Sequence, residues 1–351
     1  MITAHADVVG SLLRPAELLR AREELAAGRI TAAAFKEIED RAVDWAVRLQ
    51  EDSGVEVVTD GEMRRLSFQS QMTEAVQGLG NWNLDAFLWG EWHGVEGAED
   101  WRRERPTDIG VVGKLVRKRY LSAGEFVYLR ALTRCVPKIT LPSPGLFVNF
   151  WSPEASRDAY PILDGFLADV VRILREEVEE LARLGAVYIQ IDAPHYPLLL
   201  DPEPRAVYVS LGWTLEEWLD LGIEIDNAVM GDIPGVTFGF HLCRGNQKSR
   251  WLVEGGYEAI AEPIFQGIRA HRLLLEYDDA RSGSFAPLAH VPDDRMVVLG
   301  LVSTKRPALE EPEFLIRRID EAAACMYALQ QQVLPGQGIP VQGVGREPYR
   351  S

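Results

Sequence analysis

Short apolar runs alternate with longer helical segments along most of the chain, and this alternation constrains the fold more than any other feature. Most of the runs are nearly continuous in apolar residues, which is typical of parallel strands buried on both faces. The runs that predict strands are 6–9, 55–59, 137–141, 186–191, one that opens at Val236, 272–275 and 296–301, with a short eighth piece near Val333 and Leu334.

Segments with helical character separate most of these runs. Helices are expected over 15–27, 31–51, 159–184, 214–229, 256–268 and 313–331. Eight strand–helix units in one chain favour an α/β fold of the TIM (β/α)₈ barrel type over an open doubly wound sheet. The first strand is not followed by G-x-G-x-x-G, so the fingerprint of a dinucleotide-binding domain is missing. We therefore expect one domain over 1–351.

Residues 81–135 interrupt the alternation between the second and third predicted strands. They are rich in tryptophan and charge, and 109–116 with 125–132 alternates like a β-hairpin. We interpret the segment as an insertion in the barrel. It is expected either to cover the barrel mouth or to contact another subunit of a homo-oligomer.

Charge and cysteine content exclude several classes of function. The formal net charge of −16 argues against nucleic acid or an anionic membrane as a partner. Neither a signal peptide nor an apolar run of membrane-spanning length is found, and the three cysteines are odd in number and widely spaced. These features predict a cytoplasmic protein whose cysteines are ligands, nucleophiles or core residues.

Polar residues gather where the predicted strands end, and in a TIM barrel this face carries the chemistry. His241 and Cys243 follow the fifth run one residue apart, so both side chains point to the same side of the strand. Glu276 ends the next run. A His/Cys/Glu set suits Zn²⁺, and three protein ligands with an open position are typical of a catalytic zinc. The alternatives are a buried Cys with a hydrogen-bonded His, and a Glu276 paired with Arg281 or Lys305.

Two more carboxylates belong to the same rim. Glu62 follows the second strand and Asp192 the fourth, and together they could hold the ammonium group of an amino-acid-like substrate. Pairing with nearby arginines is an equally weighted alternative. His195 follows Asp192 in a predicted loop and is a candidate acid or base, although a histidine there is more often a mobile surface residue.

Six motifs in order make the chain resemble a known family. They are VGSLLRP (9–15), TDGEMRR (59–65), QIDAP (190–194), HLCRGN (241–246), EYDD (276–279) and GLVSTK (300–305). They resemble the cobalamin-independent methionine synthase (MetE) family, in particular its short, single-barrel branch. The resemblance extends over nearly the whole chain.

The resemblance implies a zinc-dependent methyl or alkyl transferase of methionine biosynthesis that acts on a small thiol such as homocysteine. By motif, His241, Cys243 and Glu276 match the family's zinc ligands. Glu62 and Asp192 match the carboxylates that hold the homocysteine amino group, and Ser11 matches a residue at its carboxylate. In this family zinc lowers the pKa of the substrate thiol.

The chain departs from the family pattern at the fourth zinc ligand and at the donor site. Gln337 stands where the family has a cysteine, and 142–144 replaces the tryptophan that stacks on folate. The alkyl donor is therefore open: a corrinoid protein, a sulfonium or ammonium methyl compound, or an epoxide-like electrophile. A metal-dependent lyase or hydrolase, or a non-catalytic binder of an amino-acid-like ligand, are the alternative functions.

Overall fold

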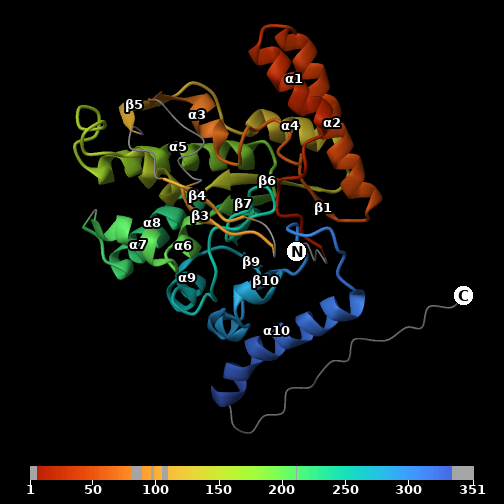
Figure 1. Ribbon diagram of the computed structural model, residues 1–351, viewed down its shortest axis with the longest axis vertical. Helices are drawn as coiled ribbons and strands as arrows, with labels where there is room; N and C mark the ends of the chain where they lie inside the picture. Colours follow the sequence, from red (N-terminus) through yellow and green to blue (C-terminus); the bar gives the residue numbers. More distant parts are fainter. Residues whose placement is uncertain (1–5, 81–88, 96–98, 105–109, 211, 334–351) are drawn as a thin grey trace, which may run out of the picture.

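A parallel sheet of six strands forms the centre of the computed structural model, which describes residues 6–80, 89–95, 99–104, 110–210 and 212–333 (Figure 1). The strand order is β1-β6-β7-β8-β9-β10, so each strand after β1 pairs with the next strand of the sheet along the chain. The bounds are β1 Val57–Val58, β6 Val136–Pro142, β7 Tyr188–Asp192, β8 Thr237–Leu242, β9 Arg272–Glu276 and β10 Met296–Gly300. These are the second to seventh strands predicted from the sequence.

The sheet is curled, and the first predicted strand lies at its start. A parallel bridge joins Asp7 to Val57 of β1. The Asp7 carboxylate also reaches side chains of three other strands: Lys138 of β6 at 2.6 Å, Tyr188 of β7 at 2.5 Å and Arg272 of β9 at 3.3 Å. A flat sheet could not bring one side chain to strands so far apart in its order. Of the eighth predicted piece, Val333 ends a helix, Pro312–Val333, instead of belonging to a strand, and Leu334 lies outside the described residues.

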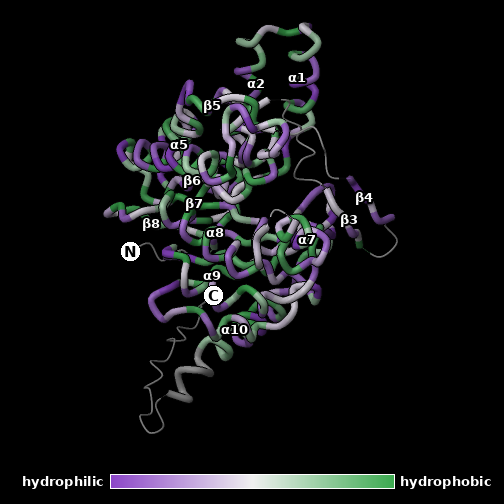
Figure 2. The backbone as a smooth tube through the Cα atoms, turned by 90° about the vertical axis from the view of Figure 1, so that its left-hand side faces the viewer, coloured by the Kyte–Doolittle hydropathy of each residue, from purple (hydrophilic) through white to green (hydrophobic). Residues whose placement is uncertain are grey.

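Helices cover the sheet, and most match the predicted ranges. The longer α-helices are α1 Ala16–Ala26, α2 Ala32–Asp52, α4 Ala123–Leu132, α5 Leu163–Arg183, α7 Pro202–Ser210, α8 Leu215–Met230, α9 Ala261–Gly267 and α10 Pro312–Val333. In α5, apolar residues at helical spacing, among them Phe166, Val170 and Leu174, are completely buried. Helices α1 and α2 project from the body as a hairpin, and the apolar strands lie in the middle (Figures 1 and 2). The helices among the described residues are all too short or too polar to cross a membrane.

The hairpin predicted from 109–116 and 125–132 is wrong. Residues Val111–Arg117 form β5, which pairs antiparallel with β2, Val76–Leu79, whereas 125–132 belongs to helix α4. Phe126 and Leu129 lie three residues apart and are both buried, because α4 packs against β6, α2 and α5. Helix α4 therefore covers the curled sheet beside β6. Strands β3, Gly90–Trp92, and β4, Trp101–Arg103, pair antiparallel as a separate small hairpin.

A buried carboxyl group joins the short helix α6, His195–Leu198, to α8. The Tyr196 hydroxyl donates to Oδ2 of Asp226 at 2.7 Å, and both side chains are completely buried. Burial raises the pKa of Asp226 from 3.8 to about 7. This carboxyl group is therefore protonated at a higher pH in the folded protein than in the unfolded chain.

We expect Asp226→Asn to weaken the pH dependence of stability. Between pH 3.8 and about 7 the folded protein binds more protons at Asp226 than the unfolded chain does, so this group's contribution to stability falls as the pH rises. Between pH 5 and pH 8, the free energy of unfolding of the variant should fall by about 1–3 kcal/mol less than that of wild type. Urea unfolding measures it, with exposed Asp220→Asn on α8 as control. Parallel profiles of wild type and Asp226→Asn would contradict the assignment.

Candidate active site

The predicted site residues come together at the carboxyl ends of neighbouring strands. Asp192 ends β7 and pairs in register with His241 of β8. Leu242 pairs with Leu275 of β9, so Cys243 and Glu276 follow at the next position of the same two strands. Glu62 follows β1, and Ser11 follows the bridge at Asp7. The parallel register therefore carries residues from distant parts of the sequence to one rim.

Glu62 is buried and held on three sides. Its Oε1 accepts from the Thr140 hydroxyl at 2.6 Å and from Arg65 at 3.3 Å, and its Oε2 accepts from the Ser11 hydroxyl. The backbone φ of Glu62 is +54°, in the left-handed region that non-glycine residues rarely adopt. Gly10 allows this close packing, since a Cβ there would stand 3.1 Å from the Glu62 carboxylate. The arginine pairing weighed from the sequence is present, and the role of Ser11 at a substrate carboxylate stays a prediction.

Arg65 extends this cluster beyond the pairing with Glu62 that was weighed from the sequence. Its guanidinium donates to Glu125 of α4 at 2.9 Å and to the Thr140 hydroxyl at 2.8 Å, and it is almost completely buried. Nearby opposite charges outweigh burial and raise its pKa. The available signal was Thr140, a polar residue within an otherwise apolar strand run.

Asp192 and His241 form a direct pair. Nδ1 of His241 lies 2.9 Å from Oδ1 of Asp192, and the same oxygen accepts from the Gln190 side-chain amide at 2.7 Å. A carboxylate on one ring nitrogen orients the imidazole and leaves the other nitrogen, Nε2, for a ligand.

Cys243 lies beside negative charge. Burial and, second to it, the Glu276 carboxylate raise the pKa of its thiol to about 12. The thiol therefore stays protonated at neutral pH unless a cation compensates the surrounding carboxylates.

Glu276 has several partners. Its Oε1 accepts hydrogen bonds from the side chains of Arg281 at 2.5 Å and Lys305 at 3.0 Å. Its Oε2 accepts a hydrogen bond from the backbone N–H of Arg244 at 2.7 Å. Although burial alone raises it, the pKa of Glu276 falls to about 2 because of Lys305 and Arg281. The two ion pairs considered from the sequence are thus both present, and they keep Glu276 ionised.

The donor chemistry of His241, Cys243 and Glu276 fits Zn²⁺. An imidazole nitrogen, a thiol and a carboxylate oxygen are all ligands that zinc accepts, and Oε2 of Glu276 keeps one lone pair beyond its bond to Arg244. Their ligand atoms are not all within 4.8 Å of one another, so binding an ion requires the side chains to approach. Gln337, the fourth predicted ligand, lies outside the described residues.

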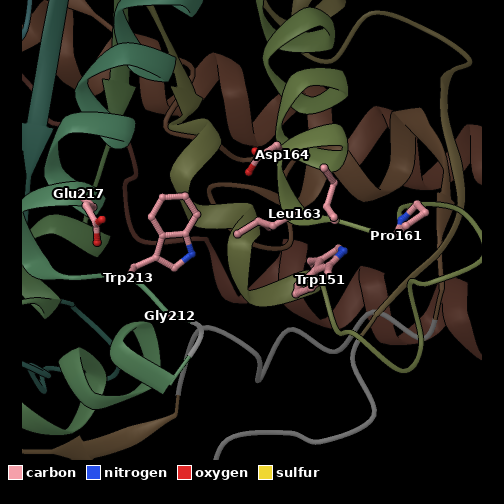
Figure 3. Close-up of a pocket in the computed structure, with 8 residues that line it drawn as sticks. Trp151, Pro161, Leu163, Asp164, Gly212, Trp213 and Glu217 are labelled. Carbon is pink, nitrogen blue, oxygen red and sulfur yellow. The ribbon is translucent and has the colours of Figure 1, made fainter.

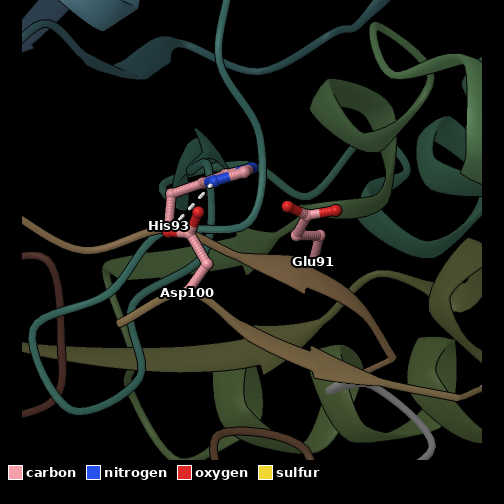
Figure 4. Close-up of side chains that lie close together, drawn as sticks. All are labelled: Glu91, His93 and Asp100. Carbon is pink, nitrogen blue, oxygen red and sulfur yellow. Dashed lines mark ion pairs between the residues drawn. The ribbon is translucent and has the colours of Figure 1, made fainter. Parts of the chain in front are cut away.

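Within the described ranges, one group has three possible metal-ligand atoms that all lie within 4.8 Å of one another. It consists of Glu91, His93 and Asp100 (Figure 4). These residues belong to the β3–β4 hairpin and its turn. Glu91 and Asp100 are exposed, Glu91 lies 3.6 Å from Arg102, and His93 lies 3.5 Å from Asp100. Exposed acidic groups of this kind are common without an ion, so this group carries no assignment.

The β3–β4 hairpin packs next to the predicted metal ligands. The backbones of His93 and Trp251 exchange two hydrogen bonds, of 2.8 and 3.0 Å. The Trp92 ring lies against Gly245, where a Cβ would stand 3.1 Å from it and where φ is +85°. Of the two roles expected for the tryptophan-rich segment, this contact favours a cover over the rim. Trp82 lies outside the described residues.

His195 is not on the surface, contrary to the commoner outcome considered from the sequence. It is completely buried on α6, and its two ring nitrogens have no hydrogen-bond partner among the described residues. Burial lowers its pKa to about 3, so the ring is neutral at physiological pH. A role as acid or base stays a prediction.

A separate open pocket of about 350 Å³ lies where α5 and α8 begin (Figure 3). Trp151 and Trp213 stand on either side of it, with Asp164 and Glu217 at its edge. The predicted site residues do not line this pocket.

Comparison with known proteins agrees with this arrangement. Residues 1–340 match the family model described as the catalytic domain of cobalamin-independent synthase. The Bacillus subtilis protein YxjH is 34% identical over 322 residues, which cover 91% of this chain and 82% of that protein. A methionine synthase of Pyrococcus abyssi is 26% identical over 317 residues, covering 90% and 80% of the two chains.

A solved structure shows the same fold. The crystal structure of a putative vitamin-B12 independent methionine synthase from Listeria monocytogenes superposes with a TM-score of 0.68 at 22% identity, covering 93% of this chain and 88% of that one. With the match over nearly the whole sequence, these findings show that the chain belongs to the family of cobalamin-independent synthase catalytic domains, and that it is a methyltransferase of the methionine synthase-like type.

Proposed function

We propose that this protein is a zinc-dependent methyl or alkyl transferase acting on a small amino-acid thiol such as homocysteine. The observation that carries the proposal is the rim of β7, β8 and β9. There the Asp192 carboxylate holds His241, and Cys243 and Glu276 both follow the last register pair of β8 and β9, Leu242 with Leu275. We further propose that the curled sheet is part of a complete (β/α)₈ barrel with 81–135 inserted in it.

His241, Cys243 and Glu276 would hold the zinc ion. Its chemistry is to lower the pKa of the substrate thiol, so that a nucleophilic thiolate forms at neutral pH. Three ligands leave a position for that thiol. Lys305 and Arg281 keep Glu276 ionised, and Asp192 keeps Nε2 of His241 available.

Glu62, Ser11 and Asp192 would hold the amino-acid end of the substrate. The two carboxylates face the same rim, and an ammonium group between them gains charge-assisted hydrogen bonds. The bonds to Asp192 from Gln190 and His241 both use Oδ1, which leaves Oδ2 for the substrate.

The proposed transfer replaces the bond between the alkyl group and its donor by a carbon–sulfur bond. The thiol proton leaves to solvent, the sulfur lone pair forms the new carbon–sulfur bond, and the bond to the donor breaks with its electron pair remaining on the donor. The longer relatives are methyltetrahydropteroyltriglutamate–homocysteine methyltransferases, for example that of Thermosynechococcus vestitus. That name states the methyl donor of the relative, and the alkyl donor of this chain is left open in the proposal.

Cys243→Ser should remove most of the zinc from protein purified without chelator, because serine replaces the ligand that zinc binds most strongly in this set. Wild type should carry about one zinc per chain by elemental analysis. Cys135→Ser is the matched control, a partly buried cysteine at the start of the β6 region. His93→Asn tests the exposed group on the hairpin. Full zinc content in Cys243→Ser, or loss in His93→Asn, would overturn the site assignment.

Glu62→Gln should weaken binding of homocysteine by roughly 10- to 100-fold, the loss expected when a charge-assisted hydrogen bond of about 1.5–3 kcal/mol is removed. Calorimetric titration measures it on the zinc-loaded protein. The control ligand is 3-mercaptopropionate, which has the thiol but no ammonium group and should bind wild type and variant alike. An equal loss for both thiols would instead indicate a structural role for Glu62.

A further inference from the structure

The hydroxyl group of Tyr257 lies between the ends of β8 and β9, next to two of the predicted metal ligands. It donates to the backbone carbonyl of Leu242 at 2.8 Å and accepts from the backbone N–H of Glu276 at 3.0 Å. The register of the two strands ends with Leu242 opposite Leu275, so Cys243 and Glu276 follow the last pair. The hydroxyl therefore joins the two backbones where the pairing of β8 with β9 ends.

Arg244 determines the direction of this hydroxyl group. Its Nη1 donates to the Tyr257 oxygen at 2.8 Å and to the carbonyl of Glu276 at 2.7 Å, and the side chains of Arg244 and Tyr257 are completely buried. A guanidinium and a backbone N–H only donate, so the hydroxyl hydrogen must point to Leu242. The one donor and both acceptor sites of the hydroxyl are then used, which leaves it a single arrangement.

The ring of Tyr257 is held from outside the two strands. The Arg244 guanidinium lies over the ring, 4.1 Å from its centre. The rings of Phe265, which belongs to α9, and of Tyr277 lie 6.1 and 5.5 Å from the Tyr257 ring. Because the ring packs against a helix as well as against the strand end, its hydroxyl is a fixed point for both backbones.

Hydrogen bonds to these two peptide groups restrain the residues that follow them. A peptide unit is planar, so a fixed carbonyl of Leu242 also fixes the N–H of Cys243 and the direction in which that residue starts. A fixed N–H does the same for Glu276. The positions of the two ligand residues relative to each other therefore depend on one hydroxyl group.

We propose that Tyr257 is a positioning residue that holds Cys243 and Glu276 at a set spacing for a metal ion. The use of that spacing for zinc rests on the proposed function. The link between the two backbones does not, because all of its hydrogen bonds are present without a metal. The hydroxyl bonds to no predicted ligand atom, so its effect passes through the backbone.

Tyr257→Phe tests the proposal, because it keeps the ring and removes only the hydroxyl. In metal-free protein, amide hydrogen exchange at Glu276 should become about three- to tenfold faster, as expected for the loss of one hydrogen bond. The Zn²⁺ affinity, measured by competition with a chelator, should fall about 10- to 100-fold, the range for groups that orient metal ligands. Unchanged zinc affinity in the folded variant would overturn the proposal.

Tyr277→Phe is the matched control. This tyrosine is also buried, follows Glu276 in the sequence, and its hydroxyl has no hydrogen-bond partner among the described residues. Its removal should leave the exchange at Glu276 and the zinc affinity as in wild type. An equal loss of zinc affinity in both variants would show a general effect of a changed core and would also overturn the proposal.

A measurement on wild type serves if Tyr257→Phe does not fold. In native-state exchange at increasing urea concentrations, the Glu276 amide should open only together with global unfolding. Opening through a local fluctuation that urea does not affect would contradict a fixed link between the strand ends.

The two proposals fail in different ways. If exchange at Glu276 depends on the Tyr257 hydroxyl but wild type binds no zinc, the link between the backbones stands and the metal-dependent function fails. If zinc binds equally tightly to wild type and Tyr257→Phe, the function stands and the positioning role fails.

Discussion

The site depends on the pairing of charged groups that the curled sheet removes from water. A buried charge without a partner costs several kcal/mol, so each carboxylate must meet a cation or a hydrogen-bond donor in a defined place. Three such clusters line the interior and the rim: Asp7 with Lys138 and Arg272, Glu62 with Arg65, and Glu276 with Lys305 and Arg281. Lys138 and Arg272 belong to β6 and β9, and Lys305 follows β10 whereas Glu276 ends β9, so two of these clusters join different strands of the sheet.

The same pairing explains how one rim can hold groups with opposite requirements. Glu276 stays ionised because two cations are close, whereas the neighbouring Cys243 thiol stays protonated because of its burial and, second to it, the Glu276 carboxylate. A metal ion bound here, as proposed, would lower the pKa of the thiol. We infer that the site is built to receive a cation.

Much of the fold could be predicted because its signals are local. Apolar strand runs and the buried stripe of α5 are set by residues close in sequence, and the structure confirms six of the predicted strands and most of the helices. The segment 125–132 is wrongly predicted as a strand because its apolar and polar residues also alternate. The three-residue spacing of Phe126 and Leu129 indicates a helix only when it is known that both side chains are buried. The pairing of β2 with β5 depends on contacts across about forty residues and has no local signal.

The clustering of the candidate residues at neighbouring strand ends could be predicted, but the hydrogen-bond and ion-pair partners of each residue could not. The motif order and the rule that strand ends carry the chemistry located Glu62, Asp192, His241, Cys243 and Glu276 on one rim. Which cation each carboxylate meets depends on side chains distant in sequence. Arg65 reaches Glu125, sixty residues away, and sequence alone could not choose between Arg281 and Lys305 for Glu276, which binds both.

X-ray absorption at the zinc edge of the purified protein tests the central claim most directly, because it counts the sulfur ligands of the metal. We expect one sulfur ligand at about 2.3 Å from the zinc, together with nitrogen or oxygen ligands at about 2.0–2.2 Å, and a second sulfur ligand when homocysteine is added. Absence of sulfur from the zinc shell, or a sulfur count that does not change with homocysteine, would contradict it.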